Sequence, residues 1–249
     1  MIRRSVRLPS PRHRGPGQAR ANRPGDVLRC VLLARGPEWV AVDVATGAVV
    51  RSHASGWPVV PADSRLAGAE GRRPRDGPTR TGPELDVVDI ELADDDEPAD
   101  PARPEAVMVL NAPDLVGTPS RRAVRRILRD LLPVDPRRPL LGSLGPSISY
   151  EDLDGSRPSV AVVAPDRAPL FAWDATGTWC QFTLGGRKHR LPVIDERISE
   201  VDGPSRGGSL SREAVEKAIG GPPRYLVVAL GVPRRGQAPK LVLGVLPRP

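Results

Sequence analysis

Proline and glycine interrupt this chain so often that long regular elements have little room to form. The 249 residues include 30 prolines and 25 glycines. Proline removes a backbone hydrogen-bond donor and glycine adds backbone entropy to the unfolded chain, so both disfavour helices. The longest apolar run, YLVVALGV at 225–232, is short. We therefore expect a mainly β chain of short strands joined by turns and loops.

Apolar runs rich in β-branched residues predict the strands, and turn residues separate them. The expected strands are 26–34, 38–44, 48–52, 84–92 and 106–110 in the first half of the chain, and 158–164, 168–173, 178–184, 187–193, 224–232 and 240–246 in the second. Two short helices are expected, at 118–132 and 209–220. The first has Thr118 as its N-cap and Pro119 in its first turn, and the second ends at Gly220.

A strand–turn–strand unit containing Ala-Thr-Gly occurs twice, as WVAVDVATGAVV at 39–50 and LFAWDATGTWCQF at 170–182. Each copy is typical of a β-hairpin around a glycine-bearing turn. The echo indicates either two small β-barrels or one β-rich domain with a pseudo-repeat. A propeller would need at least four such blades, and only two occur.

The expected organisation has four parts. Residues 1–24 are rich in arginine, proline and glycine and lack hydrophobic periodicity, so they should form a disordered basic arm. The first β-barrel should cover 25–117, with a long loop at 61–83 and an acidic segment at 93–105. A basic amphipathic helix at 118–133 is followed by the second β-barrel at 134–249, with its helix at 209–220 and a closing hairpin at 224–246.

The net charge of +7 comes from the N-terminal arm, because residues 1–30 hold eight arginines and one acid. Such an arm would attract polyanions. The alternative is the codon bias of a GC-rich genome, since 34 of the 37 basic residues are arginine. The five arginines of the helix at 118–132 pose a similar choice. They either bind phosphates or an acidic surface, or are balanced by the acidic stretch 84–105 of the same chain.

No constellation in the sequence indicates catalysis, a metal site or a cofactor, so we expect a non-enzymatic protein. Cys30 and Cys180 lack the spacing of a zinc site and should be buried, reduced thiols. The three histidines are isolated, and the aspartates at 94–96 lack the spacing of a calcium loop. With no signal peptide and no apolar stretch of about 20 residues, the expectation is a cytoplasmic protein without a membrane partner.

The strongest binding signal is the run of basic side chains at 187–190, which follows a Gly-Gly turn. On a strand, Arg187 and His189 point one way, while Lys188 and Arg190 point the other. Four of the eight aromatic residues lie just before this run: Phe171, Trp173, Trp179 and Phe182. Basic side chains beside aromatic rings hold single-stranded nucleic acid through phosphate contacts and base stacking. Alternatively, Phe171, Trp173 and Phe182 form the core of a small barrel, and the outward-facing residues on those strands would contact the ligand.

Three stretches also carry a resemblance: PELDVVDIEL at 83–92, PSVAVVAPDRAPLFAWDATGTWCQFTLGGRKHRLPVID at 158–195 and RYLVVALGVPRRGQAPKLVLGVLP at 224–247. They resemble successive blocks of the dual OB-containing domain (DuOB-like) family of prokaryotes, and the closing hairpin is the most specific piece. GAVVRSHASGW at 47–57 is a fainter counterpart of another block, in which Arg51 is the matching arginine. The resemblance implies two OB-type barrels and a role in nucleic-acid binding or sensing, as in defence against foreign DNA or RNA.

The expected fold class is therefore mainly β with two short helices, with two small OB-like β-barrels in tandem and a disordered N-terminal arm. The expected function is non-enzymatic binding or sensing of single-stranded DNA or RNA. The candidate contact residues are Arg51, Trp57, Arg187, Lys188, Arg190 and Lys240. The alternative is an accessory module that docks a protein partner through the acidic segment and the Arg-rich helix.

Overall fold

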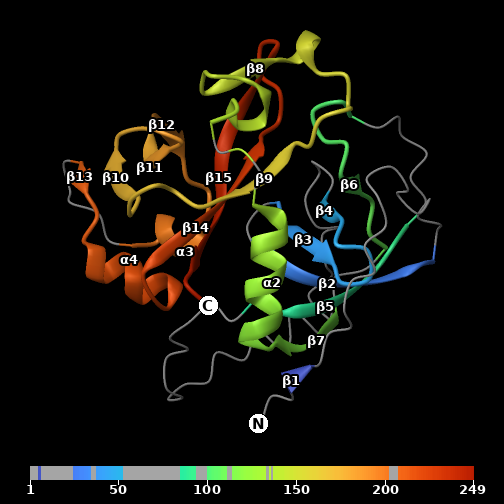
Figure 1. The fold of residues 1–249 in the computed structure, drawn as a ribbon. Helices are drawn as coiled ribbons and strands as arrows, with labels where there is room; N and C mark the ends of the chain where they lie inside the picture. The colour runs from blue at the N-terminus through green and yellow to red at the C-terminus, as the bar shows by residue number, and fades with distance from the viewer. Residues whose placement is uncertain are drawn as a thin grey trace.

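Three β-sheets dominate the fold (Figure 1). The computed structural model describes residues 5–6, 25–34, 38–52, 85–93, 100–110, 114–132, 135, 137–201 and 207–249. The first sheet has the strand order β1 (Ser5–Val6), β7 (Asp114–Pro119), β5 (Val87–Glu91), β2 (Val27–Ala34), β3 (Val40–Asp43), β4 (Val49–Ser52) and β6 (Ala106–Val107).

The other two sheets come from the second half of the chain. The central sheet has the order β8 (Ser147–Ser149), β15 (Gln237–Pro247), β14 (Pro223–Leu230) and β9 (Val160–Val163). The outer sheet has the order β12 (Arg187–Pro192), β11 (Gly177–Leu184), β10 (Leu170–Asp174) and β13 (Gly208–Ser209). The helices are α2 (Arg121–Leu131), α3 (Glu196–Ser199) and α4 (Arg212–Ile219), with single 3₁₀ turns at Leu140–Gly142 and Tyr150–Asp152.

The predicted mainly β fold class, with β-rich units in tandem, is confirmed. Figure 1 shows β9, β14 and β15 of the central sheet between the outer sheet on one side and the first sheet on the other. The expected hairpin around the first Ala-Thr-Gly turn is β3–β4, and the second turn joins β10 to β11.

The central sheet is buried on both of its faces. Along β14, Leu226 and Val228 face core 1, which the central sheet shares with the outer sheet, α3 and α4. The alternate residues Val227 and Ala229 face core 2, which it shares with the first sheet and α2. Side chains along a strand alternate between its two faces, so a strand that is buried on both faces must be apolar at successive positions. The run at 225–232 meets this requirement.

The two longer helices begin and end at capping residues. Ser120 caps α2, since its hydroxyl accepts a hydrogen bond from the backbone N–H of Ala123. The expected N-cap at Thr118 is therefore wrong. The residue before a proline favours extended backbone, and Thr118 and Pro119 continue β7 instead. Helix α4 ends as predicted at Gly220, whose φ of +78° suits glycine.

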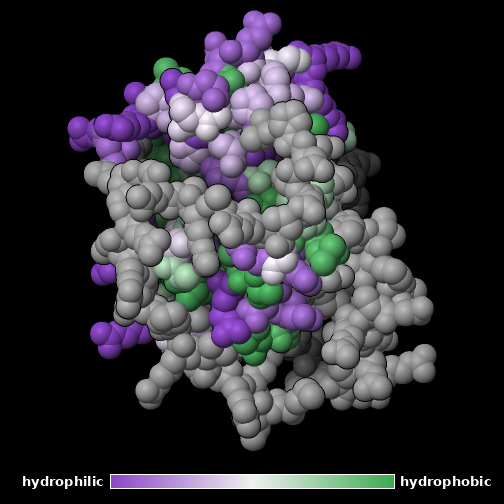
Figure 2. Space-filling view, turned by 90° about the vertical axis from the view of Figure 1, so that its right-hand side faces the viewer, coloured by the Kyte–Doolittle hydropathy of each residue, from purple (hydrophilic) through white to green (hydrophobic). Residues whose placement is uncertain are grey.

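Several predicted segments lie outside the described residues, namely the loop at 61–83, residues 94–99 of the acidic segment and most of the arm at 1–24. Within the arm, the structure differs from the expectation at Ser5 and Val6. These two residues form β1, which pairs in parallel with β7. On the side of the molecule that Figure 2 shows, the upper part is mostly hydrophilic, and hydrophobic residues form small patches among hydrophilic ones lower down.

Candidate nucleic-acid interface

The outer sheet has one apolar face and one polar face, because its strands alternate in register. Phe171 lies opposite Cys180 and Phe182 opposite His189 on the side of core 1. The opposite side, which we call the outer face, carries Leu170, Ala172, Asp174, Trp179, Gln181, Thr183, Lys188, Arg190 and Pro192. None of these nine residues is buried. The sheet therefore presents a continuous polar and aromatic surface backed by a hydrophobic core.

The basic run on β12 divides as its alternation predicts. Lys188 and Arg190 lie on the outer face, opposite Thr183 and Gln181, and both are exposed. His189 points toward core 1, where its ring stacks on Phe182 with the centroids 5.0 Å apart. Burial, followed by the nearby positive charges, lowers the pKa of His189. Arg187 begins the strand and is exposed.

Trp179 is the aromatic residue that reaches the outer face, where polar contacts fix its indole ring. The indole Nε1 donates to Asp174 Oδ1 and to Thr176 Oγ1, at 3.1 Å each. The guanidinium carbon of Arg190 lies over the ring, 4.5 Å from its centroid. Arg190 Nη2 also donates to Asp174 Oδ2 at 2.8 Å. One carboxylate thus holds both the edge of the indole and the cation on its face.

The same carboxylate caps its own turn. Thr176 donates to Asp174 Oδ1 through its backbone N–H at 2.8 Å and through its hydroxyl at 2.5 Å. Hydrogen bonds from Thr176, and then those from Trp179 and the charge of Arg190, lower the pKa of Asp174. The carboxylate is therefore ionised at neutral pH, the state in which it pairs with Arg190.

The other aromatic residues of this region belong to the core, as the alternative interpretation of the sequence stated. Phe171 and Phe182 are buried in core 1, and Trp173 packs partly buried against it. Trp179 was expected only as one of four nearby aromatic residues, and Asp174 and Gln181 were not expected to contribute. Side chains alternate between the two faces along a strand, so a buried Phe182 places Trp179 and Gln181 on the opposite face. This alternation was the signal in the sequence that could have identified them.

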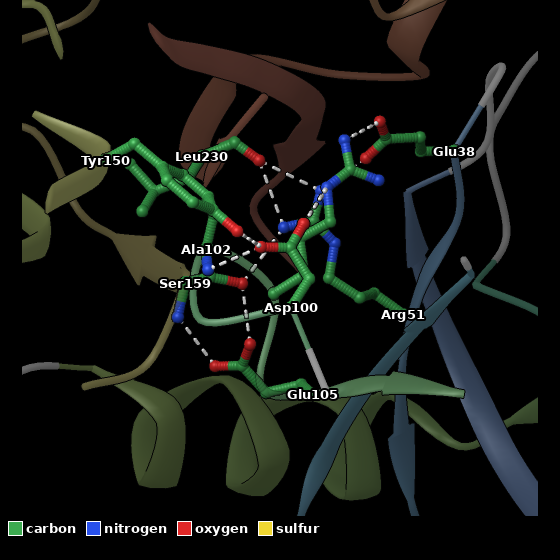
Figure 3. A network of polar contacts seen from close by, with 9 residues as sticks. Glu38, Arg51, Asp100, Ala102, Glu105, Tyr150, Ser159 and Leu230 are labelled. Carbon is green, nitrogen blue, oxygen red and sulfur yellow. Dashed lines mark hydrogen bonds and ion pairs between the residues drawn. The ribbon is translucent and has the colours of Figure 1, made fainter. Parts of the chain in front are cut away.

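Arg51 was expected to contact nucleic acid, and the structure corrects this, since Arg51 is fully buried between the first and central sheets. Figure 3 shows its guanidinium at the centre of a polar network. Nη1 donates to Ser159 Oγ at 2.9 Å and both terminal nitrogens donate to the Leu230 carbonyl at 3.0 Å. Glu38 pairs with Arg51 and also accepts from Arg103 at 2.7 Å. Burial lowers the pKa of Arg51, against the raising effect of Glu38.

The remainder of the network anchors the start of β9. Glu105 accepts from the backbone N–H of Ser159 at 2.7 Å and from its hydroxyl at 2.6 Å. Tyr150 donates its hydroxyl proton to Asp100 at 3.2 Å, and the N–H of Ala102 donates to the same carboxylate. The residues of this network therefore tie the first sheet to the central sheet rather than face a ligand (Figure 3).

Lys240 is corrected in the same way, since it is fully buried. Its ammonium Nζ donates to the carbonyl oxygens of Ser143 and Gly145, at 2.7 Å each. Burial lowers the pKa of Lys240 to about 8. Of the six expected contacts, Arg187, Lys188 and Arg190 remain at the surface, and Trp57 lies outside the described residues.

The described residues offer little else that would carry chemistry. Cys30 and Cys180 are free and buried, and burial raises the pKa of both thiols. Among the residues that the structure describes, no group of three or more histidine, cysteine or acidic side chains could hold a metal ion. None of the described helices has the length and apolar character needed to cross a bilayer.

No protein-family model, no curated protein and no solved structure matches the chain.

Proposed function

We propose that this protein is a non-enzymatic module that binds single-stranded DNA or RNA, and that the outer face of the outer sheet is its binding surface. The observation that carries the proposal is the register of β10, β11 and β12. It brings Lys188 and Arg190 onto the same exposed face as Trp179. The residues around them, Leu170 and Gln181, are exposed on that face as well.

Single-stranded nucleic acid needs two kinds of contact, and this face has both. Cations bind the phosphates, while aromatic rings and guanidinium planes stack on unpaired bases. Unlike a helix that reads a groove, an exposed sheet face can bind a strand whose bases are splayed out. The resemblance to the dual OB-containing family supports the same ligand class, and a role in prokaryotic defence rests on that resemblance alone.

Binding can be tested by fluorescence anisotropy with a labelled 20-nucleotide single strand of DNA or RNA at low salt. We expect the variant Lys188→Ala/Arg190→Ala to bind about tenfold more weakly than the wild type, because it loses a phosphate contact and a stacking group. The matched control is Arg212→Ala/Lys217→Ala on α4. It removes the same two charges, also exposed, and its arginine is likewise paired with an acid, Glu216.

A third variant separates the sheet from the arm, by replacing the arginines of residues 1–24 with serine. If only this arm variant weakens binding, the outer face is not the binding surface. If the wild-type protein binds neither DNA nor RNA at low salt, the proposed function is wrong.

The second candidate function is a docking module for a protein partner, and helix α2 favours it. Arg121, Arg122, Arg125 and Arg129 are exposed along this helix, while Ile127 and Leu128 on the other side are buried. Such a row of guanidinium groups fits an acidic surface. Replacement of the four exposed arginines by alanine should abolish capture of that partner and weaken nucleic-acid binding less than Lys188→Ala/Arg190→Ala does. The variant Lys188→Ala/Arg190→Ala should leave capture of the partner unaffected.

A further inference from the structure

The two Ala-Thr-Gly turns use the same local device, but only the second extends it to other side chains. In the first turn, Asp43 accepts hydrogen bonds from the N–H of Ala45 at 3.0 Å and from the N–H and hydroxyl of Thr46 at 3.2 and 2.5 Å. Asp43 is buried. These three hydrogen bonds all come from its own turn.

In the second turn the aspartate makes the same contacts to Thr176 and then two more. Asp174 also accepts from the indole of Trp179 and pairs with Arg190. These two contacts lie on the exposed outer face, where the side chains of Asp174 and Arg190 are 40% and 53% exposed. An exposed ion pair contributes little to stability, typically below about 1 kcal/mol. Stability alone therefore gives a weak reason for the arrangement.

The geometry instead fixes two side chains of the outer face in place. The indole is fixed at its Nε1 by two acceptors, and the guanidinium is fixed over the ring by its bond to the same carboxylate. A long arginine side chain loses rotamer entropy when it is ordered, and an arginine ordered in advance does not lose it again on binding. Both indole rings and guanidinium planes stack on unpaired bases.

We infer that Asp174 is a positioning residue that holds Trp179 and Arg190 together as one rigid surface on which an unpaired base of the ligand stacks. This inference rests on the proposed function and adds that the outer face binds bases as well as phosphates. Thr176 supports the same arrangement, because its hydroxyl lies between Asp174 and the indole nitrogen.

The inference is tested by comparing the affinity for an oligothymidine strand with the affinity for an abasic strand of the same length and charge. The wild type should bind the oligothymidine strand at least about fivefold more tightly, the equivalent of one stacked base. Asp174→Asn, which cannot form the ion pair, should lower this ratio about threefold or more, with little loss of binding to the abasic strand.

Two further variants make the test independent of charge and of folding. Thr176→Val keeps the charge but removes a hydrogen bond to the indole, and Arg190→Lys keeps the charge but removes the planar group. Both should lower the ratio as Asp174→Asn does. The control Lys188→Ala should weaken both strands alike and leave the ratio unchanged, because Lys188 contacts phosphate only.

If the ratio in Asp174→Asn and Thr176→Val equals that of the wild type while both strands still bind, Asp174 does not position a stacking surface. A wild-type ratio of one would also overturn the inference and leave phosphate binding in place. If the wild type binds neither strand, the proposed function itself has failed.

Discussion

Arg51 and Lys240 are two cations held inside the protein by different partners. Arg51 pairs with the carboxylate of Glu38 and donates to the carbonyl of Leu230, whereas the ammonium group of Lys240 donates to the carbonyl oxygens of Ser143 and Gly145. Ion pairing stabilises a buried charge, but carbonyl dipoles compensate only part of its lost hydration. The two residues should therefore respond differently to substitution and to pH.

Lys240 should make the stability of the protein rise with pH in the alkaline range. Its pKa is about 8 in the folded protein, against an ordinary value of 10.5. Between these two values the unfolded chain binds a proton that the folded chain has lost, so raising the pH favours the folded state. We expect the free energy of unfolding of the wild type, relative to Lys240→Met, to rise by roughly 1–3 kcal/mol between pH 8 and pH 10.5. Urea denaturation at several pH values measures it, and a constant difference would contradict the prediction.

Arg51 should be far more important to stability than an exposed arginine with a similar partner. Arg51→Met leaves the carbonyl of Leu230 and the hydroxyl of Ser159 without this donor and removes one of the two cations at Glu38. The expected loss is about 3–5 kcal/mol in the free energy of unfolding. The control Arg29→Met breaks a bidentate pair with Asp89 at the surface and should cost less than about 1 kcal/mol. Equal losses in the two variants would argue against a structural role for the buried network.

At the scale of elements, the central sheet is the part on which the others depend. Core 2 is made by the first sheet and α2 on one side and by β9, β14 and β15 on the other. The first sheet approaches the central sheet closely at Gly244 of β15. A Cβ atom there would lie 2.9 Å from Cβ of Ala34 and 3.0 Å from the carbonyl oxygen of Leu33. Glycine is therefore required at this crossing of β2 and β15.

Gly244→Ala should destabilise the protein by about 1–3 kcal/mol, because the added methyl group forces the two sheets apart. Gly145→Ala is the matched control, since its Cβ would meet the carbonyl oxygen of Ser147 only at 3.7 Å, an ordinary contact. Thermal unfolding followed by circular dichroism compares the two. If Gly244→Ala melts no lower than Gly145→Ala, the close approach of the sheets is not as described.

The elements with strong local signals were predictable from the sequence, and those that depend on distant partners were not. The apolar run of β14 predicts a buried strand, and the amphipathic pattern of α2 predicts a helix, without reference to the rest of the chain. Strand β7 was missed because it contains Gly117 and Pro119, and it becomes a strand by pairing with β5. Leu141 and the turn around it were likewise not expected, since nothing local marks a leucine with a φ of +51°.

In the candidate site, too, local patterns were predictable from the sequence and contacts with distant residues were not. Alternation along β12 separated Lys188 and Arg190 from His189, but it could not say which side faces the core until Phe182 was placed in it. Arg51 was misjudged because Ser159 and Leu230, which surround it, lie 108 and 179 residues away in sequence. Whether a cation is buried depends on such partners, and one sequence does not reveal them.

At the scale of the whole molecule, basic residues occur on the outer face, on the exposed side of α2 and in the sequence of the N-terminal arm. Each of them attracts a polyanion, so weak binding of nucleic acid by itself does not identify the surface that binds. What distinguishes the outer face is that one of its cations, Arg190, lies over the ordered ring of Trp179. If this face binds the strand, its lysine, Lys188, contributes to the salt dependence of binding.

The most direct measurement is the slope of the logarithm of the binding constant against the logarithm of salt concentration, for a labelled single strand. Each phosphate contact with a single strand contributes about 0.7 to the magnitude of this slope. We predict that Lys188→Ala reduces the magnitude by about 0.7, while Lys217→Ala, which removes an exposed lysine from α4, leaves it unchanged. If Lys188→Ala has the slope and affinity of the wild type, the outer face does not bind the strand.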